Sequence, residues 1–289
     1  MKKIGKLVVI GVGLIGGSFA LALKRHRAVG RVVGVGRSRA NLAAARRRRV
    51  IDEIADIPGA VGDADLVLLA VPPGQMAGVL KQIAPHLGPH TIVTDAGSTK
   101  QDVVAAARAA LGPAFARFVP AHPIAGTENS GAAAAFPELF VGRTLIVAPQ
   151  RETDRRALRR VTAAWKLCGM SIVTMTAAEH DRVFALVSHL PHLISFALVG
   201  QIARRKDGRR LFACGGGALR DMSRIAASSP EMWCDISFAN RKALLDVTGD
   251  YLQEIGTLRD AVKRNDRVRF GKYLEKVSAA RRRWTPRKR

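Results

Sequence analysis

The chain has 289 residues, enough for about two domains that each bury a core without disulfides or metals. No run of uninterrupted apolar residues reaches the length of a membrane span, and three widely spaced cysteines argue against a disulfide framework or a metal site and indicate a cytoplasmic protein. The formal net charge of +24 favours anionic ligands and requires that nucleic-acid binding be considered.

Apolar runs alternate with amphipathic segments through the first part of the chain. They predict strands at 7–11, 31–35, 66–71, 91–95, 117–121, 144–148 and 171–175, and helices at 14–24, 41–49, 76–84, 101–111 and 152–167. Strands that alternate with helices are typical of a doubly wound, mostly parallel sheet. We therefore expect an α/β domain of Rossmann type over residues 1–176.

The pattern changes after this point. Strand-like runs disappear, and periods of 3.6 residues extend over 179–204, 217–226 and 230–247, with two further helices to the end. Pro191 lies inside the first of these helices, where a proline removes a backbone donor and should produce a kink. Residues 177–289 are predicted to form an all-helical second domain.

A glycine-rich turn joins the first strand to the first helix. In the stretch from Gly11 to Gly16, the first glycine permits the tight turn, Gly13 lets the backbone approach a pyrophosphate, and Gly16 allows the helix to pack on the strand. Leu14 and Ile15 open the helix, whose free N–H groups would face the phosphates. An incidental glycine-rich turn is the less favoured interpretation, because the position between strand and helix fits the dinucleotide fingerprint.

The end of the second strand bears on the choice of cofactor. An acidic residue there would bind the ribose of NAD, but this chain has Gly36, followed by Arg37 and Ser38. A guanidinium and a hydroxyl could bind a 2′-phosphate, which favours NADP; alternatively Arg37 stacks on the adenine and either cofactor is accepted. Val71 and Asp95, at the ends of two further strands, complete the predicted cofactor site.

A histidine follows the strand predicted at 117–121. His122 should lie at the carboxyl edge of the sheet, where ligands bind, and an imidazole can accept and donate a proton near neutral pH. Ser98 follows another strand and should reach the same edge, either to hydrogen-bond His122 or substrate or to cap the next helix. We predict His122 and Ser98 to be catalytic.

The helical half offers further candidates near its own glycines and proline. Ser188 and His192 share a helix face with His189 close by, which indicates either a pocket lining or buried structural histidines, but no zinc site, because no carboxylate or cysteine completes one. After Gly215–Gly217, a helix carries Arg220, Asp221 and Arg224, which could bind a substrate carboxylate or form an ion pair within the helix. Trp233 would cap the pocket or pack in the core.

These blocks, in this order and over nearly the whole chain, resemble the prephenate/arogenate dehydrogenase family of tyrosine biosynthesis. The resemblance rests on the glycine turn, Asp95 to Lys100, His122 to Glu128, Ser188 to His192, Arg220 to Arg224, and Met232-Trp233. It implies a Rossmann domain, a helical dimerisation domain, and NAD(P)-dependent oxidative decarboxylation of a cyclohexadienol, with a homodimer as the assembly. Some relatives carry a regulatory or mutase module for which we see no room after the helical region.

The resemblance also implies roles within the site. His122 would take the proton of the 4-hydroxyl, and Arg224 would hold a substrate carboxylate. His192 would contact the side-chain end, while Thr127, Glu128 and Ser188 would line the pocket, with His189 and Trp233 nearby. If Asp221 reaches the substrate side chain, it would favour the ammonium group of arogenate over the keto group of prephenate.

Two alternatives remain to be compared with this hypothesis. One is another Rossmann and helical-domain dehydrogenase of the β-hydroxyacid or pyrroline-carboxylate type, which typically needs a lysine in the helical half that we cannot place. The other is a nucleic-acid-binding protein. The basic clusters at 46–49, 155–160, 204–210 and 281–289 lie on separate segments without interleaved aromatics, so solvated helix faces are favoured. We expect no nucleic-acid or membrane partner.

Overall fold

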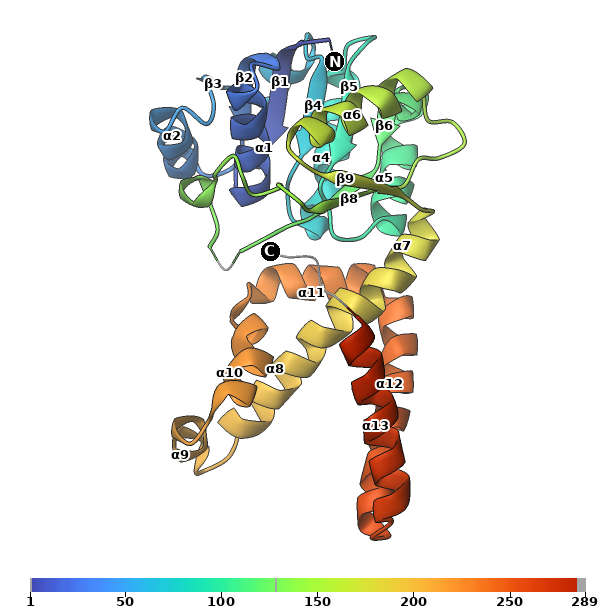
Figure 1. Ribbon diagram of the computed structural model, residues 1–289. Coiled ribbons are helices and arrows are strands. Elements are labelled where there is room, and N and C mark those ends of the chain that lie inside the picture. The colour runs from blue at the N-terminus through green and yellow to red at the C-terminus, as the bar shows by residue number, and fades with distance from the viewer. Residues whose placement is uncertain (1, 128, 285–289) are drawn as a thin grey trace.

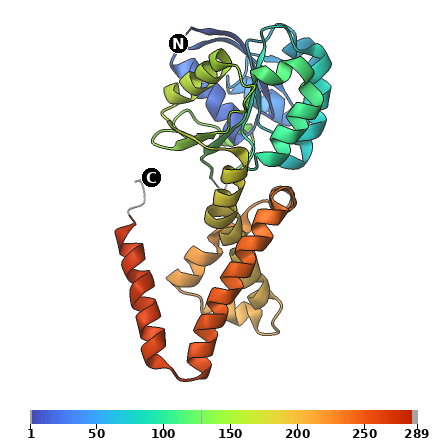
Figure 2. The same ribbon diagram turned by 90° about the vertical axis from the view of Figure 1, so that its right-hand side faces the viewer.

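A computed structural model describes residues 2–127 and 129–284. An α/β part lies above a helical part, and α7 (Ala177–Phe184) connects the two (Figure 1). The view turned by 90° shows the same two parts, with α12 (Arg241–Lys263) and α13 (Arg267–Arg283) forming a helical hairpin that extends away from the sheet (Figure 2).

The α/β part is built on a six-stranded parallel sheet. Its strand order is β3-β2-β1-β4-β5-β6, and every recorded pairing within it is parallel. The order reverses between β1 and β4, which creates the crevice at the carboxyl edge where doubly wound sheets bind ligands. This confirms the predicted fold. The strands are β1 (Ile4–Ile10), β2 (Val29–Val35), β3 (Glu53–Ile54), β4 (Leu66–Leu69), β5 (Ile92–Asp95) and β6 (Phe118–Val119).

Helices cover both faces of this sheet. Successive residues of a strand point to opposite faces, so Val8 and Val9 of β1 belong to two different hydrophobic cores. On one face Phe19 packs against Trp165 with ring centroids 4.3 Å apart, and on the other Met76 is buried. The helices are α1 (Leu14–Arg25), α2 (Arg39–Arg47), α3 (Ile57–Val61), α4 (Pro73–Ile83), α5 (Gln101–Leu111) and α6 (Arg155–Leu167), with 3₁₀ turns at Ala84–His86, Gly112–Arg117 and Ala132–Ala134.

A second sheet changes the expected layout. The strand predicted at 117–121 is divided at Pro120 into β6 and β7 (Ala121–Ile124), because a proline cannot donate a ladder hydrogen bond. The backbone N–H of Ala148 donates to the Pro120 carbonyl at 3.0 Å. β7 pairs antiparallel with β8 (Thr144–Val147), which pairs parallel with β9 (Ser171–Thr174). The last two strands were therefore predicted correctly as strands, but they lie outside the main sheet.

The helical part contains no strand among its described residues. The pattern predicted at 230–247 is broken at Asn240, and a π-helical turn precedes Pro191 where we expected a proline kink. The segment α9 (Gly208–Ala213) was not predicted. The helices are α7, the π turn η4 (Ala185–His189), α8 (Leu190–Ala203), α9 (Gly208–Ala213), α10 (Gly217–Ser223), the 3₁₀ turn η5 (Arg224–Ala227), α11 (Pro230–Ala239), α12 and α13.

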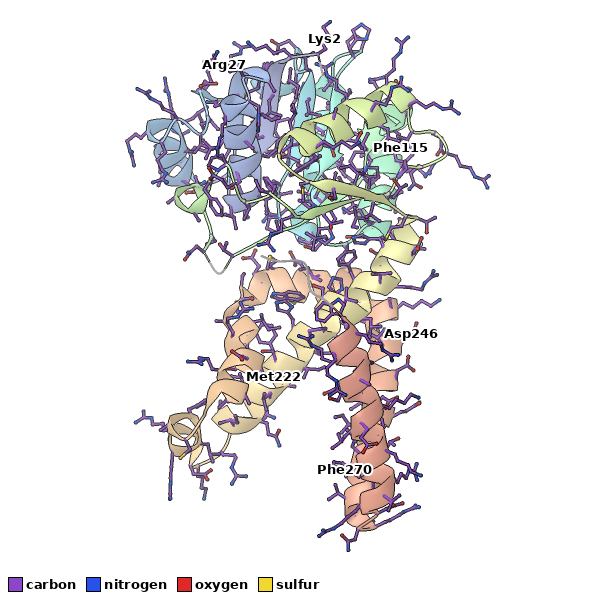
Figure 3. The ribbon with its side chains drawn as sticks, viewed as in Figure 1. Lys2, Arg27, Phe115, Met222, Asp246 and Phe270 are labelled. Carbon is purple, nitrogen blue, oxygen red and sulfur yellow. The ribbon has the colours of Figure 1, made fainter. Side chains whose placement is uncertain are left out.

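Apolar side chains are exposed over much of this helical part. Figure 3 shows side chains extending from both of its arms, with Met222 on α10 and Phe270 on α13 labelled. Met222 is 51% exposed, and several other large apolar side chains of these helices are exposed to a similar degree. The continuous segment Ala177–Ala203 is long and apolar enough to cross a membrane, and its most apolar 18-residue stretch has a mean hydropathy of 1.8. Only 28% of that stretch is buried within the chain. The segment is nevertheless interrupted by ionisable side chains that belong to the site described below.

Candidate active site

The glycine turn after β1 has the geometry of a cradle for a phosphate. Gly11 has φ +93°, and a Cβ there would lie 2.3 Å from the Ala70 carbonyl oxygen; a Cβ at Gly16 would lie 2.5 Å from the Gly11 carbonyl oxygen. Both positions therefore exclude any larger residue. A Cβ at Gly13 would meet no atom of the described chain within 4 Å beyond those of its immediate chain neighbours. The turn is thus closely packed at Gly11 and Gly16 and open at Gly13.

The first turn of α1 lies beside this open side. Gly13 is the N-cap of α1, no side chain caps the helix, and Leu14 and Ile15 pack partly buried against the core. The Val71 side chain borders the turn, since it lies 3.1 Å from where a Cβ of Gly11 would be. A free helix N-terminus with close backbone access fits the pyrophosphate of a dinucleotide. The residues present therefore fit the predicted cofactor.

The end of β2 is open to solvent. Gly36, Arg37 and Ser38 are exposed, and the Ser38 hydroxyl accepts a hydrogen bond from the Asn41 backbone N–H at 3.2 Å as the cap of α2. A Cβ at Gly36 would make only ordinary contacts with Leu42. Nothing in the local packing therefore forces a glycine where an acid would bind a ribose.

His122 lies on β7 and is only partly exposed. Its Nδ1 is 2.8 Å from the Nε2 of His180, and its ring packs against Phe184 with centroids 4.9 Å apart. No described residue hydrogen-bonds its Nε2. Burial, together with the nearby charges of His180, Lys100 and His189, holds the pKa of His122 well below the ordinary value of 6.5. The imidazole is therefore neutral near pH 7, as a proton acceptor must be.

Ser98 makes neither of the protein contacts considered for it in the part of the chain that the structure describes. Among the described residues, no hydrogen bond joins Ser98 to His122, whose Nδ1 is taken by His180. Ser98 does not cap α5 either, because the N-cap is Lys100 and the first backbone N–H groups of that helix donate to Asp181. Ser98 is partly exposed, so contact with a substrate stays a prediction.

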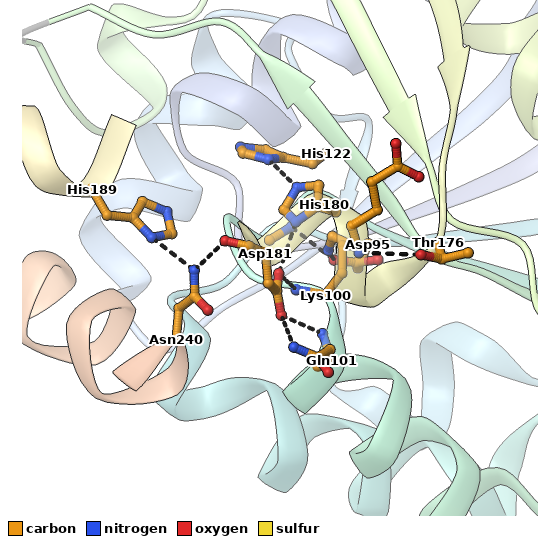
Figure 4. A network of polar contacts seen from close by, with 11 residues as sticks. Asp95, Lys100, Gln101, His122, Thr176, His180, Asp181, His189 and Asn240 are labelled. Carbon is orange, nitrogen blue, oxygen red and sulfur yellow. Dashed lines mark hydrogen bonds and ion pairs between the residues drawn. The ribbon is translucent and has the colours of Figure 1, made fainter. Parts of the chain in front are cut away.

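Asp181 connects the two parts of the molecule (Figure 4). Its carboxylate accepts hydrogen bonds from the backbone N–H of Lys100 at 2.8 Å and of Gln101 at 2.9 Å, and from the ring Nδ1 of His180 at 2.8 Å. Burial alone would raise the pKa of Asp181, but these hydrogen bonds outweigh it and lower the pKa. His180 is fully buried, and that burial lowers its pKa despite the adjacent carboxylate.

Asp95 is buried inside the protein, in contrast to the cofactor contact we predicted for it. Its side chain and that of Lys100 are both 0% exposed and form an ion pair. Its oxygens also accept the backbone N–H groups of Gly97 at 2.8 Å and Ala121 at 3.0 Å. Asp95 therefore fixes the loop after β5 and the start of β7, next to His122, and its carboxylate is occupied by protein donors.

The helical wall of the site begins at His189. This histidine is 2% exposed, and its Nδ1 accepts a hydrogen bond from the Asn240 amide at 3.2 Å. Asn240 also donates to the Asp181 carbonyl oxygen at 2.7 Å. Burial lowers the pKa of His189 to about 4. Of the two interpretations the sequence left open, a satisfied structural histidine fits this environment, so we do not propose direct substrate contact for His189.

His192 lies one turn further along and is half-buried. Its ring stacks on Trp233 with centroids 3.5 Å apart, and its Nδ1 donates to the Ser188 carbonyl at 3.0 Å. Burial lowers its pKa, and the positive charge of Arg224 adds to the effect, which places that arginine close by. The buried indole N–H of Trp233 has no hydrogen-bond partner among the described residues. His192, Trp233 and Arg224 thus lie close together and form a polar and aromatic wall.

The remaining predicted residues are distributed around this wall. Ser188 is partly exposed beside His192, and Thr127 is exposed on the loop after β7. Asp221 is exposed on α10, with no recorded contact to His192 or Trp233 in the described part of the chain. Glu128 lies outside the described residues. Within the described ranges, no cluster of three or more His, Cys, Asp or Glu side chains could hold a metal ion.

Sequence reasoning missed His180, Asp181, Lys100 and Asn240. His180 and Asp181 lie within a polar run, residues 179–182, near the start of the long apolar segment Ala177–Ala203, and all four missed residues are buried. Buried polar groups must be hydrogen-bonded, so a polar pair entering such a helix was the available signal. Its partners could not be identified, because Asp181 lies 81 residues from Lys100 and 59 residues from Asn240 in the sequence.

Known proteins match the chain over almost its full length. The family models for the prephenate dehydrogenase nucleotide-binding domain and dimerization domain match residues 19–174 and 176–276. Cyclohexadienyl dehydrogenase of Zymomonas mobilis is 37% identical over 271 residues, which cover 93% of this chain and 90% of that protein.

Two solved structures extend the comparison to the fold. Prephenate dehydrogenase from A. aeolicus, in complex with hydroxyphenyl propionate and NAD+, is similar with a TM-score of 0.90 and 32% identity, covering 96% of this chain and 98% of that one. Synechocystis arogenate dehydrogenase has a TM-score of 0.81 and 30% identity, covering 97% of this chain and all of that one.

The Rossmann sheet, the open glycine turn and the neutral histidine on β7 define an NAD(P)-dependent dehydrogenase with a helical second domain. The family models and the 37% identity narrow this class further. The chain belongs to the prephenate dehydrogenase family, which confirms the resemblance drawn from its motifs.

Proposed function

We propose that this protein catalyses the NAD(P)-dependent oxidative decarboxylation of prephenate, of arogenate, or of both, in tyrosine biosynthesis. The observation that carries the proposal is a neutral histidine, His122, at the sheet edge, with its Nδ1 held by protein and no described partner on its Nε2. The named relatives act on these two cyclohexadienols. The bound nicotinamide supplies the acceptor for the hydride.

His122 accepts the proton of the substrate hydroxyl and later returns it. As hydride leaves ring C4, the 4-hydroxyl proton moves toward His122 Nε2, because an oxygen with more negative charge expels hydride more easily. The C1–CO2 bond then breaks, and its electron pair completes the aromatic ring. The proton returns to the same oxygen, which becomes a phenol, so the histidine is unchanged at the end of the cycle.

The helical wall would orient the substrate. We propose that Arg224 binds a substrate carboxylate and that His192 contacts the side-chain end with its Nε2, since its Nδ1 already donates to Ser188. The unpartnered indole N–H of Trp233 offers a further donor to the same ligand. Ser188, Ser98, Thr127 and Glu128 complete the proposed lining. Substrate choice would depend on Asp221 only if it reaches the side-chain end, and Asp221→Asn should then shift kcat/KM toward prephenate.

The cofactor preference proposed here is NADP, with NAD also possible. Support comes from the exposed Gly36–Ser38 segment, which holds no carboxylate and presents Arg37 to solvent. Arg37→Ala should raise the KM for NADP about tenfold and leave that for NAD within twofold, because it removes one charge-assisted contact to a 2′-phosphate. Equal effects on both cofactors would instead indicate that Arg37 stacks on the adenine.

A homodimer through the helical domain, residues 177–289, is the assembly we propose. The exposed apolar side chains of the helical arms and the largely unburied segment Ala177–Ala203 support it, because a second copy would cover them. The nucleotide-binding domain would then comprise residues 1–176. We further propose a cytoplasmic protein without nucleic-acid or membrane partners, whose basic clusters attract substrate dianions.

A four-way assay tests the function directly. Prephenate and arogenate are each offered with NAD and with NADP, and reduced nicotinamide is followed by absorbance. We expect turnover in at least one combination, and a fall of about 10³-fold or more in kcat for His122→Asn. The proposal fails if purified, folded protein turns over neither substrate, or if His122→Asn retains full activity.

A further inference from the structure

Three polar side chains form a continuous hydrogen-bonded chain between the two domains. His122 on β7 contacts His180 on α7 through Nδ1 and Nε2 at 2.8 Å, and His180 contacts Asp181 through Nδ1 and Oδ1 at 2.8 Å (Figure 4). His180 and Asp181 are 0% and 1% exposed. The function proposed above uses only the first of these three residues.

The other contacts of Asp181 determine which atoms donate and which accept along these three side chains. Its oxygens accept from the backbone N–H groups of Lys100 and Gln101, and from the Gln101 side-chain amide at 3.3 Å. A carboxylate surrounded by donors is ionised and can only accept. The Nδ1 of His180 must therefore carry a hydrogen, which leaves its Nε2 as an acceptor in the neutral ring.

The same logic applies to the next ring. Because His180 Nε2 accepts, the Nδ1 of His122 must donate to it. A neutral imidazole carries one ring hydrogen, so His122 Nε2 holds the free lone pair. The opposite polarity would place a hydrogen on His122 Nε2, and that tautomer could not accept a proton from a substrate hydroxyl.

We propose that His180 and Asp181 are positioning residues that set the tautomer of His122 and keep its Nε2 available as the proton acceptor. The inference rests on the proposed function and deepens it. When Nε2 takes up a proton, the Nδ1 proton can shift toward His180, and Asp181 then balances the positive charge. Asp181 thereby offsets part of the cost that burial imposes on a transient imidazolium.

This arrangement also makes the proton acceptor depend on domain packing. His122 belongs to the nucleotide-binding domain, whereas His180 and Asp181 belong to the first helix of the other one. Asp181 simultaneously caps the N-terminus of α5. The His122 tautomer is consequently fixed only when the two domains are docked against each other.

Asp181→Asn is the decisive variant. The oxygen that accepts from His180 Nδ1 also accepts from the Lys100 backbone N–H, whereas the other oxygen accepts from Gln101. In asparagine, an NH2 in the first place would donate to His180 Nδ1 and reverse the polarity of both rings at the loss of the Lys100 hydrogen bond, while the carbonyl in the second place still accepts from Gln101. We expect kcat to fall about 10²- to 10⁴-fold, with KM within threefold of wild type and a melting temperature lowered by the lost Lys100 hydrogen bond. Asp181→Glu, which keeps the charge, should recover part of the rate.

A matched control comes from the second carboxylate that crosses the interface. Asp235 on α11 accepts the Gly74 backbone N–H at 3.0 Å, at the start of α4, and it has no recorded contact with His122 or His180. Asp235→Asn should change stability to a similar extent and leave kcat within twofold. An equal loss of kcat in both variants would indicate a general effect of domain docking and would overturn the proposal.

Nuclear magnetic resonance of ¹⁵N-histidine-labelled protein reports the tautomers independently of turnover. We expect His122 to be protonated at Nδ1 and free at Nε2 in the wild type, and the reverse in Asp181→Asn. A wild-type ring protonated at Nε2, or a variant with kcat within threefold of wild type, refutes the proposed role. If the wild type has the expected tautomer but turns over neither cyclohexadienol, the proposed function fails instead.

Discussion

Lowering the pH from 7 to 5 should destabilise the folded protein, and His189 alone should account for about 2 kcal/mol of the loss. Burial reduces the pKa of this side chain from the ordinary value of 6.5 to about 4. In the unfolded chain the imidazole is free to take up a proton below pH 6.5, whereas the folded site resists it. The unfolded state therefore binds more protons between the two values.

The sign and size follow from this difference. Because the unfolded state binds the extra proton, stability rises with pH across the interval and is lost as the pH falls from about 6.5 to about 4. The full interval corresponds to about 3 kcal/mol. His189 is almost fully buried, so little of this is screened by solvent.

Urea unfolding at pH 7 and pH 5, at one fixed protein concentration, measures the effect. His189→Gln removes the titrating group while its side-chain carbonyl can still accept from Asn240, so this variant should lose about 2 kcal/mol less than wild type on acidification. His90→Gln, on an exposed histidine, is the control and should behave as wild type. If His189→Gln loses as much stability as wild type, the burial argument is wrong, and a substrate-facing His189 becomes the better interpretation.

Three further outcomes follow from individual contacts. Gly13→Ala places a Cβ in open space, so the melting temperature should hold while the dissociation constant for the dinucleotide rises about tenfold or more, as calorimetry would show. Asp235→Ala removes the cap on the Gly74 N–H and should cost about 1 kcal/mol in denaturant unfolding. Trp233→Phe keeps an aromatic face for His192 but loses the buried N–H donor, so KM for the cyclohexadienol should rise about fivefold, the equivalent of one neutral hydrogen bond.

The main sheet was predictable because its strands are buried on both faces. Leu66–Leu69 is a continuous apolar run with every residue buried, and such runs are the sequence signature of parallel strands. The glycine turn was equally informative, since Gly11 and Gly16 have steric requirements that no other residue meets. The short strand Glu53–Ile54 was missed, because two exposed residues at a sheet edge carry no periodic signal.

The second sheet could not be predicted from local patterns. Residues 118–121 read as one apolar run, and only the pairing partners show that Pro120 separates two strands of different sheets. Hydrophobic periodicity identifies a buried strand but not its neighbour. The same limit explains why His122 was placed correctly at the sheet edge, while its antiparallel setting was not foreseen.

Sequence reasoning singled out candidate residues whose own side-chain chemistry is distinctive. It missed residues whose importance depends on contacts between distant segments. His122, His192 and Arg224 were singled out from their motifs; the structure places His122 on β7 and His192 against Trp233, and the roles of all three stay predictions. The contact between His122 and His180 joins residues 58 positions apart on two domains. Ser98 was considered as a partner of His122 because it follows a neighbouring strand, whereas the partner recorded in the structure, His180, comes from the other domain.

The setting of His122 on β7 determines which changes this segment can tolerate. His122 lies opposite Ile146 of β8, between Ala121 and Pro123, whose side chains point to the other face of the ribbon. Exchanging either neighbour for a residue of similar size leaves the imidazole where it is. Inserting or deleting a single amino acid between Ala121 and Ile124 would instead shift the register and move the imidazole to the opposite face of the strand. Length in this short segment should thus be more strictly fixed than composition.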